Sequence, residues 1–390
     1  MSVGDVELFE HQRDFLDGIV SQPAPARACL YFKTGAGKSM TAMLGMRTLG
    51  YDEVLVIAPP STHAQWGALA QQLGMEAQTM SHAKFRMKTT QVSKTMPLIA
   101  DESHMFGGHK GQGWRKLDTL AMHLRAPLFL LSATPQYNDA ERVYCITHVI
   151  DPHNNKGGYL SFLYTHCITK QNPFSLEPLV EGFKNYASAE EFLASYPGVY
   201  YLPDDTVFTI DDIPWPARQA DEFEVYNYDR RKHRVMASQI EKRHARVNNV
   251  LIGTDGFIDP KVMDVVLDLI MPVIDGGKVL VYATHATVAM ALARTLGHLG
   301  PRVAVVTGSQ TKAEKERLLR LFKTGGCDIL IGTATLATGT DGLDKVCDTL
   351  LILDDTDDDA LRRQLIGRIM PRGEDTDASS KKVFRLLLLT

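Results

Sequence analysis

Short apolar runs alternate with longer segments of helical periodicity in the first third of the chain. The apolar runs are Ala28–Phe32, Val54–Ala58, Pro97–Ala100 and Pro127–Leu131, and the helical segments include Ser39–Leu49 and Thr62–Leu73. Short continuous apolar runs are typical of strands buried on both faces, and intervening helices return the chain so that such strands pair in parallel. The pattern predicts an α/β region with a parallel sheet.

The same alternation returns in the last third of the chain. The runs there are Lys278–Tyr282, Arg302–Val306, Asp328–Gly332 and Thr349–Leu353, with Val383–Leu389 as a last strand. We therefore expect a second, similar parallel sheet, and an α/β fold class overall.

The middle of the chain breaks this pattern. Helical pieces, aromatic residues and turn dipeptides such as Asn154-Asn155 and Gly157-Gly158 fill it. We interpret residues 139–260 as a mainly helical insertion or linker between a first domain, 1–138, and a second, 261–390. The insertion carries a basic segment that includes Arg230, Arg231 and Lys232 and continues to Lys242-Arg243-His244-Ala245-Arg246. Such a run is ordinarily a solvated helix face.

Composition narrows the class of protein. The chain has 390 residues, of which 44% are hydrophobic and 23% charged, which suggests two or three globular units and excludes disorder. No apolar run approaches the roughly 20 residues of a membrane span, and the first residues lack an export signal. We expect a soluble, cytoplasmic protein with no membrane partner, in a host cytoplasm if its source is viral.

The cysteine spacing and the net charge exclude further classes of protein. The five cysteines are scattered and never spaced as C-x-x-C, so the sequence supports neither a disulfide framework nor a structural zinc site. The formal net charge of −4 argues against a protein coated in positive charge, although a local basic surface can still hold a polyanion.

A phosphate-binding loop follows the first predicted strand. Lys33-Thr34-Gly35-Ala36-Gly37-Lys38-Ser39 stands between that strand and a helix, although Phe32 occupies the position of the usual first glycine. The glycines let backbone N–H groups face phosphates, Lys38 adds a positive charge on the β and γ groups, and the Ser39 hydroxyl can ligate Mg²⁺. The order of strand, loop and helix favours this interpretation over a chance G-K-S.

An acidic pair follows another predicted strand. Asp101-Glu102-Ser103-His104 comes directly after Pro97–Ala100, at the edge of the sheet where the phosphate loop must lie. We expect Asp101 to hold the Mg²⁺ of a nucleotide and Glu102 to orient or deprotonate the attacking water. His104 is then a coupling contact. An acidic helix N-cap is the alternative, and the nearby phosphate loop favours catalysis.

The next strand ends in two hydroxyl residues. Ser132-Ala133-Thr134-Pro135 can hydrogen-bond both the acidic pair and elements that move, so Ser132 and Thr134 are predicted coupling residues. The order of these motifs resembles that of the helicases and translocases of superfamily two, whose motor is a pair of RecA-like lobes closing on ATP. The resemblance extends along nearly the whole chain.

The resemblance implies further roles. Phe9-Glu10-His11-Gln12 resembles the family's adenine-reading motif, with Gln12 as the base contact. The stretch from Val54 to Trp66 is similar to motif Ia, which implies that Pro59 and Thr62 contact the nucleic-acid backbone, whereas Trp66 is interpreted as a packing residue.

Two motifs of the second domain complete the comparison. The stretch from Thr335 to Asp344 resembles motif V, which implies that Thr335 contacts nucleic acid and that Gly339 and Asp341 contact the nucleotide. Gln364 to Gly373 resembles motif VI, with Gln364 as a coupling residue. Its arginines, Arg368 and Arg372, would reach the γ-phosphate, and Arg372 lies one residue beyond the usual spacing. An arginine supplied in this way is worth about 10³–10⁵ in rate.

The resemblance implies an ATP-dependent motor on nucleic acid. Thr34, Gly35, Gly37, Lys38 and Ser39 would bind ATP with Mg²⁺. Nucleic acid, DNA in preference to RNA, would be held mainly by its backbone phosphates, with Arg230, Arg231 and Lys232 contributing. The layout is similar to Swi/Snf-type translocases, while Ser-Ala-Thr-Pro is the form of many unwinding helicases, including compact phage helicases. Unwinding and duplex tracking both stay open, as does the oligomeric state, a monomer included.

Other function classes remain as alternatives. Asp354-Asp355-Thr356-Asp357-Asp358-Asp359 would suit the metal-dependent nuclease of a terminase-like packaging motor. Adjacent acids point in different directions, so we interpret this run as a solvated loop. Two simpler alternatives are a P-loop ATPase that acts on no nucleic acid and a degenerate pair of lobes that serves as a scaffold.

Overall fold

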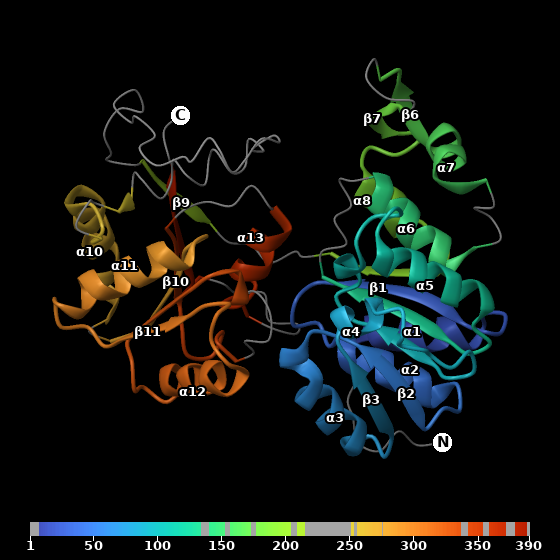
Figure 1. The fold of residues 1–390 in the computed structure, drawn as a ribbon, viewed down its shortest axis with the longest axis horizontal. Helices are drawn as coiled ribbons and strands as arrows, with labels where there is room; N and C mark the ends of the chain where they lie inside the picture. Colours follow the sequence, from blue (N-terminus) through green and yellow to red (C-terminus); the bar gives the residue numbers. More distant parts are fainter. Residues whose placement is uncertain are drawn as a thin grey trace. The chain divides into compact units, whose positions relative to one another are not determined.

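The buried apolar runs assemble into two six-stranded sheets in the computed structural model, one sheet in each of two units (Figure 1). The units are Met1–Asp204 and Asp205–Thr390. The structure describes residues 8–133, 140–152, 157–172, 177–203, 209–214, 251–252, 256–274, 276–336, 342–353, 359–371 and 379–387.

The sheet of the first unit has the strand order β3-β2-β4-β5-β1-β8. Its strands are β1 (Arg27–Phe32), β2 (Glu53–Ile57), β3 (Glu76–Met80), β4 (Leu98–Ala100), β5 (Leu128–Ser132) and β8 (Val199–Leu202). All neighbouring strands pair in parallel. The carboxyl ends of β4, β5 and β1 therefore meet at one edge, with β5 between the other two.

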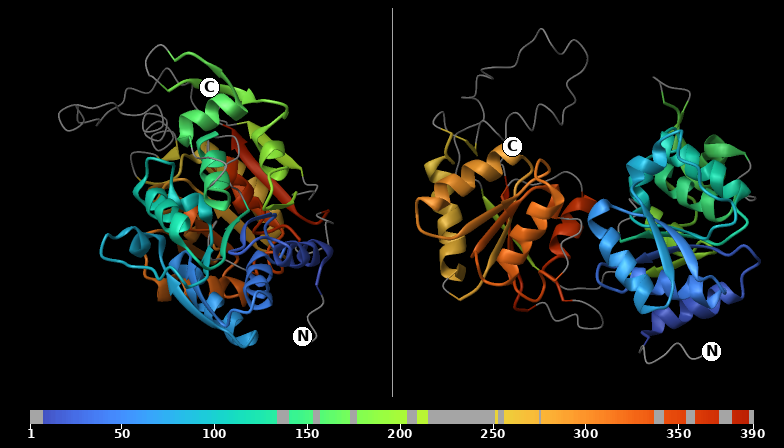
Figure 2. Two further views of the ribbon diagram at one scale, coloured as in Figure 1. Left: turned by 90° about the vertical axis from the view of Figure 1, so that its right-hand side faces the viewer. Right: turned by 60° about the horizontal axis from the view of Figure 1, so that its bottom comes forward.

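Helices cover both faces of this sheet because alternate strand residues point to opposite sides. Ala28, Leu30 and Phe32 pack on the side of α1 (Glu10–Val20), α2 (Lys38–Thr48) and α3 (His63–Gln72). Cys29 and Tyr31 pack on the other side. That side carries α4 (His82–Arg86), α5 (Gln112–His123), α6 (Ala140–Ile150) and α8 (Ala189–Ala194). Two further views show the same layers (Figure 2).

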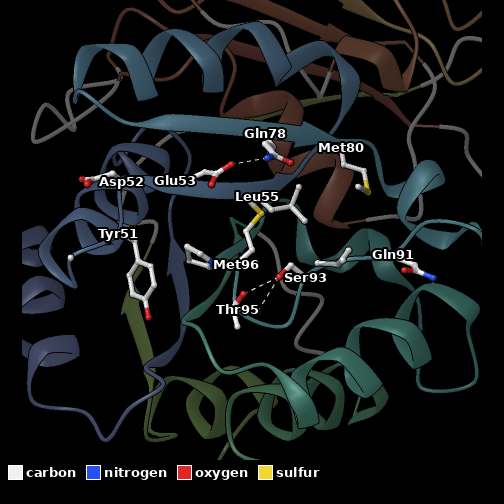
Figure 3. A pocket seen from close by; sticks show the side chains of 13 residues that line it. Tyr51, Asp52, Glu53, Leu55, Gln78, Met80, Gln91, Ser93, Thr95 and Met96 are labelled. Carbon is white, nitrogen blue, oxygen red and sulfur yellow. Dashed lines mark hydrogen bonds between the residues drawn. The ribbon is translucent and has the colours of Figure 1, made fainter.

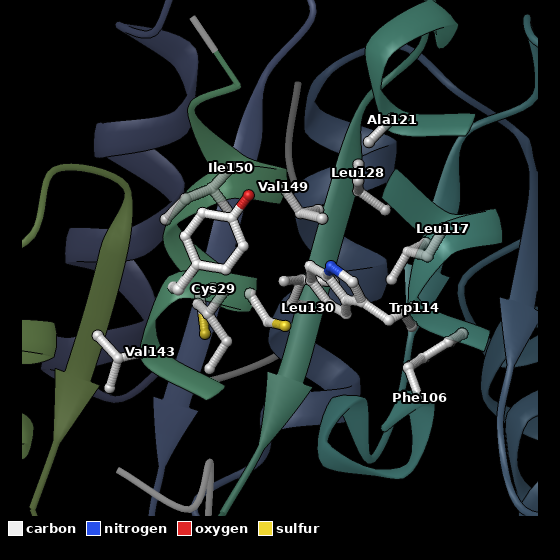
Figure 4. Close-up of a cluster of buried hydrophobic side chains, with 14 of the residues drawn as sticks. Cys29, Phe106, Trp114, Leu117, Ala121, Leu128, Leu130, Val143, Val149 and Ile150 are labelled. Carbon is white, nitrogen blue, oxygen red and sulfur yellow. The ribbon is translucent and has the colours of Figure 1, made fainter. Parts of the chain in front are cut away.

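The hydrophobic core on the side of Cys29 and Tyr31 contains residues from the beginning and from the end of the first unit. Figure 4 shows Cys29 and Leu130 of the sheet beside Trp114 and Leu117 of α5. Residues of α6, among them Val143, complete the same cluster. Helix α6 is thus part of the first unit's core.

The separate, mainly helical insertion expected over 139–260 is not what the described residues form. Strand β8 pairs with β1 and extends the first sheet, and β9 (Ile210–Pro214) pairs with β14 (Lys382–Leu387) of the second sheet. Between α6 and β8 along the chain, α7 (Gly158–His166) leads into an antiparallel pair, β6 (Cys167–Lys170) and β7 (Leu179–Phe183). Parts of this stretch are therefore strands of the two six-stranded sheets. Residues 215–250, with the basic segment, lie outside the described residues.

The sheet of the second unit has the strand order β11-β12-β10-β13-β14-β9, again with parallel neighbours. Its remaining strands are β10 (Val279–Tyr282), β11 (Val303–Val306), β12 (Ile329–Gly332), β13 (Thr349–Ile352) and β14 (Lys382–Leu387). Its two cores involve α10 (Pro260–Ile274) and α11 (Ala286–Gly297) on one side, and α12 (Lys312–Lys323) and α13 (Asp359–Ile366) on the other.

The α/β class and the parallel sheets are confirmed. Each predicted strand is present, with ends displaced by one residue or two in the described residues. Strands β3, β8 and β9 were not predicted, since they are sheet edges or are partly polar. All five cysteines are free and buried. Among the described residues, no helix combines the length and apolarity that crossing a membrane requires.

Candidate nucleotide-binding site

The phosphate loop of the first unit has the geometry expected of such a loop. It leaves β1 and enters α2, and two of its glycines take left-handed backbone angles, with φ of 83° at Gly35 and 76° at Gly37. The Nζ atom of Lys38 donates to the carbonyl oxygens of Phe32 at 2.9 Å and Lys33 at 3.1 Å. The ammonium group therefore lies over the turn between strand and helix. Thr34 and Ser39, which belong to the same loop, are half-buried.

Gln12 is buried against this loop. Its side-chain Oε1 accepts from the Phe9 N–H at 3.1 Å, and its Nε2 donates to Thr41 Oγ1, also at 3.1 Å. The Thr41 hydroxyl in turn donates to the Gly37 carbonyl at 3.0 Å. A Cβ atom on Gly37 would lie 2.6 Å from Gln12 Nε2, so the Gln12 side chain can occupy this position only because residue 37 is glycine. The structure thus brings Gln12 and the phosphate loop together.

Asp101 follows β4 at the same edge of the sheet and is held at several atoms. Its carboxylate accepts from Trp66 Nε1 at 3.2 Å and from the Glu102 N–H at 3.0 Å. Its backbone N–H donates to Ile57 at 2.8 Å, and its carbonyl accepts from His82 Nε2 at 2.9 Å. These contacts fix the direction of the carboxylate, which is what a metal ligand requires.

Burial dominates the electrostatics of this site. Removal from water, followed by the negative charge of Glu102, raises the pKa of Asp101 to about 7, against the opposing effects of Trp66 and Lys38. Burial also lowers the pKa of His82 to about 4, so its ring is neutral near pH 7. A cation bound beside Asp101 would favour the ionised carboxylate.

Glu102 and His104 lie between Asp101 and the end of β5. Glu102 adopts φ 47°, a left-handed conformation that costs a non-glycine residue on the order of 1–3 kcal/mol and that clusters at functional sites. His104 Nδ1 lies 3.4 Å from the Glu102 carboxylate and 3.3 Å from the Ser132 hydroxyl. The two predicted coupling residues His104 and Ser132 are therefore in contact.

The first turn of α6 holds the loop that follows the acidic pair. Arg142 Nη1 donates to the His104 carbonyl at 3.3 Å. The Glu141 carboxylate accepts from the His109 N–H at 2.8 Å and lies 2.6 Å from its Nδ1. A Cβ atom on Gly108 would lie 2.2 Å from that carboxylate, so the loop and α6 are in close contact.

The segment after β2 contains Pro59 and Thr62, the two residues predicted to contact nucleic acid. Pro59 precedes a short 3-10 helix, η1 (Pro60–Thr62), and the Thr62 hydroxyl donates to the Pro59 carbonyl at 2.9 Å. His63 Nε2 donates to the Ala58 carbonyl at 3.0 Å. Trp66 is 2% exposed, as its packing role predicts, and α3 carries it from this segment to Asp101.

In the second unit, the described motif residues lie near the ends of β12 and α13. Thr335 belongs to a short 3-10 helix, η4 (Ala334–Leu336), and its hydroxyl donates to the Val306 carbonyl at 3.3 Å. Gln364 and Arg368 are both nearly buried, at 7% and 8% exposure. The other predicted site residues lie outside the described residues, and they are Thr134, Arg230, Arg231, Lys232, Gly339, Asp341 and Arg372. The acids of the 354–358 run lie outside them as well.

A separate pocket of about 630 Å³ lies away from the phosphate loop (Figure 3). Asp52 and Glu53 line one part of it, and Ser93 and Thr95 of the segment before β4 line another. Most of its lining residues precede β2 and β4, at the opposite ends of these strands from the site. Within the described residues, no three His, Cys, Asp or Glu side chains are arranged to hold a metal ion.

Several contacts were missed from sequence. The indole N–H of Trp66, the ring of His82 and the first turn of α6 all contact the acidic segment. Of these contacts, only that of Trp66 could have been suspected from sequence, because Trp66 follows Pro59–Thr62 closely. The other groups contact the acidic segment only because of tertiary packing.

Comparison with known proteins finds a family match over part of the chain and solved structures of similar fold. Residues 261–373 match the helicase conserved C-terminal domain. The fold is similar to that of S. cerevisiae Dbp5 bound to RNA and ADP BeF3, with a TM-score of 0.54, 14% identity, and coverage of 98% of this chain and 88% of that one. For a single-substitution variant of Dbp5, also bound to RNA and ADP BeF3, the TM-score is 0.53, again at 14% identity, with coverage of 100% and 90%. Among curated proteins, no sequence matches. Residues 261–373 therefore match a helicase conserved C-terminal domain, and the chain shares with the Dbp5 structures a fold that here contains two parallel six-stranded sheets.

Proposed function

We propose that this protein is a nucleic-acid-dependent ATPase of the helicase type, which hydrolyses ATP with Mg²⁺ at the phosphate loop of its first lobe. The observation that carries the proposal is the convergence of Gln12, the phosphate loop and the Asp101–His104 segment at one sheet edge. The helicase conserved C-terminal domain over 261–373 supports it independently.

The residues present fit ATP and Mg²⁺. Left-handed glycines at 35 and 37 leave backbone N–H groups free of side-chain obstruction, and Lys38 supplies a positive charge. Ser39 and Asp101 offer the hydroxyl and carboxylate oxygens that Mg²⁺ prefers, and phosphate oxygens would complete its shell. When bound, Mg²⁺ neutralises the charge that develops on the phosphates.

Each residue of the site then has a separate proposed role in ATP hydrolysis. Asp101, whose carboxylate accepts from Trp66 and the Glu102 N–H, would hold the metal. Glu102 orients the attacking water and accepts its proton at a carboxylate oxygen. His104, in contact with Ser132, would relay the state of this site to the end of β5. Arg368 is proposed to stabilise the transferring phosphate, as motif VI arginines do.

We propose DNA as the nucleic acid, held by its backbone phosphates at Pro59, Thr62 and Thr335, with Arg230, Arg231 and Lys232 contributing. The Swi/Snf-like order of motifs supports DNA. The Dbp5 structures of similar fold are bound to RNA, so RNA is the comparison that the experiment must include.

Two substitutions test the chemistry. Lys38→Ala should lower ATP turnover by about 10²–10³-fold because it removes a charge from the phosphates. Glu102→Gln should abolish turnover while a fluorescent ATP analogue still binds, since only proton acceptance is lost. Lys170→Ala and Glu76→Gln, on exposed residues outside the site, are the matched controls. Wild-type turnover in either site variant would refute the assignment.

The substrate is tested with the unmodified protein. ATP turnover is measured with single-stranded DNA, duplex DNA, forked DNA and RNA, and a strand-displacement gel follows on the strongest activator. We expect DNA to stimulate turnover more than RNA. Greater stimulation by RNA would overturn the DNA proposal alone, and no stimulation by any of them would overturn the dependence on nucleic acid.

A further inference from the structure

One lateral face of the first lobe is rich in positive charge. Between residues 81 and 125, every exposed side chain that carries a full charge is lysine or arginine. The three acids of this stretch are less exposed: Asp101 and Glu102 belong to the site, and the Asp118 carboxylate lies 3.1 Å from His148 Nε2. This concentration of positive charge contrasts with the whole chain, which has 46 acidic and 42 basic residues.

Six residues define this basic face, and they lie on α4, on α5 and on the connections that follow these two helices, whose ribbons Figure 1 shows. They are Arg86, Lys88, Lys94, Arg115, Lys116 and Arg125.

Short contacts join these segments. Lys116 Nζ donates to the carbonyls of Met87 at 2.7 Å and Thr90 at 2.6 Å. The Arg86 side chain packs over α5, because a Cβ atom on Gly113 would lie 3.3 Å from it. The Arg125 N–H donates to the Lys94 carbonyl at 2.7 Å. These contacts place Arg86, Lys94, Lys116 and Arg125 on segments that pack against one another.

None of the six forms an ion pair with another described residue. Other exposed cations do form ion pairs: Lys110, in the same stretch but not one of the six, lies 2.6 Å from Glu177, and Arg302 lies 2.6 Å from Asp328. Like charges gathered without counter-charges repel one another, so such a face is matched by a polyanion.

The face has a defined border. Across the pocket of Figure 3, Asp52 and Glu53 stand opposite Ser93 and Thr95, the neighbours of Lys94. Glu53 accepts from Gln78 Nε2 at 2.7 Å, so it is engaged on that side. Positive charge therefore extends over α4 and α5 and stops at this pocket.

The face also connects to the site. Arg86 Nε donates to the His82 carbonyl at 3.3 Å, and His82 Nε2 donates to the Asp101 carbonyl at 2.9 Å. An anion bound at Arg86 is thus two hydrogen-bonded steps from the acidic pair.

We propose that the basic face binds the sugar–phosphate backbone of nucleic acid, as a contact surface additional to Pro59, Thr62 and Thr335. This inference rests on the proposed function, because it assumes that nucleic acid is the partner. The described residues 81–125 expose no phenylalanine, tyrosine or tryptophan side chain on which a base could stack. The contact is therefore with phosphates, independent of base sequence, and suited to duplex as well as single strands.

The test compares two triple variants of equal charge change. Lys88→Gln, Lys94→Gln and Arg125→Gln remove half of the face, while Lys170→Gln, Lys261→Gln and Lys312→Gln remove three exposed lysines elsewhere. Binding of labelled duplex DNA and RNA is measured by fluorescence anisotropy over a salt series. The face triple should bind about tenfold or more weakly at low salt, with the slope of log K against log salt reduced by about 2 to 3.

The control triple should keep the wild-type slope. Both triples should keep the basal ATP turnover measured without nucleic acid, which shows that the site is intact. An unchanged affinity and slope in the face triple would overturn the inference while leaving the proposed function standing. A wild-type protein that binds no nucleic acid would instead overturn the proposed function.

A single variant tests the connection to Asp101. Arg86→Gln should weaken binding and lower nucleic-acid-stimulated turnover more than Lys88→Gln does, and Arg86→Lys should restore binding in part because it restores the charge. Vesicles with anionic lipid provide the opposing arm. If the face triple loses vesicle binding yet keeps its nucleic-acid affinity, the partner is a lipid surface and the inference is wrong.

Discussion

At the scale of single residues, the Trp66 side chain both packs in the hydrophobic core and positions the Asp101 carboxylate. Its ring is buried among core residues on the α2 and α3 side of the first sheet, and its N–H reaches the Asp101 carboxylate. Sequence reasoning placed it in the core, which is correct, but the direction of the N–H depends on where α3 lies.

We predict that Trp66→Phe raises the Mg²⁺ concentration needed for half-maximal ATP turnover by about tenfold or more, because Asp101 loses a partner that orients it. Stability should fall by about 1–3 kcal/mol. Trp114→Phe is the matched control, since Trp114 is 3% exposed and packs on the other face of the sheet. Equal Mg²⁺ dependence in the two variants, measured beside their thermal unfolding, would reject the positioning role.

Gly37 carries a second residue-scale prediction. Gly37→Ala should cost about 1–2 kcal/mol of stability because its φ of 76° disfavours a Cβ atom, and it should also displace Gln12 and weaken ATP binding. Gly50→Ala separates the two effects: its φ is 87°, but nothing lies within 4 Å of the added atom. Denaturant unfolding should show similar losses, and nucleotide titration should show a defect in Gly37→Ala alone. Equal nucleotide affinity would contradict this account.

At the scale of elements, strand position decided what could be predicted. The strands β1, β2, β5 and β10 are buried on both faces, so their apolar runs are visible in the sequence. Strand β3 reads Glu-Ala-Gln-Thr-Met and lies at a sheet edge, where half-exposed polar residues are tolerated. Strand β9, Ile-Asp-Asp-Ile-Pro, is also an edge strand. Pairing with a neighbour, rather than its own pattern, makes each of these a strand.

Helix α6 shows the same dependence on context. It follows the Ser132–Pro135 motif in sequence, and its first turn contacts the loop after the acidic pair through Glu141 and Arg142. The sequence pattern predicts helical pieces in this stretch but does not predict which loop the first turn of α6 contacts. The contact therefore came from the tertiary structure.

At the scale of the whole molecule, the first lobe includes residues beyond the expected boundary at 138. Strand β8 pairs with β1, and α6 and α8 cover one face of the sheet. The middle stretch was interpreted as an insertion because its pattern is irregular, although much of it completes a lobe.

We predict that residues 1–204 expressed alone unfold cooperatively, whereas residues 1–138 do not. The shorter piece lacks β8 and leaves Cys29 and Leu130 without the α6 side chains that cover them (Figure 4). Thermal unfolding followed by circular dichroism, with light scattering for aggregation, distinguishes the two fragments. Cooperative unfolding of 1–138 at the temperature of 1–204 would show that a boundary at 138 already encloses a complete lobe.

The sequence by itself determined the α/β class, the two parallel sheets and the position of the phosphate loop and acidic pair, because those features depend on local apolar runs and on residues that follow strands directly. Tertiary structure alone decided the edge strands, the contacts of Trp66, His82 and α6 with the acidic segment, and the gathering of the six cations on one face. Each of these depends on how separate elements pack, and the pattern of any one element does not determine which others it contacts.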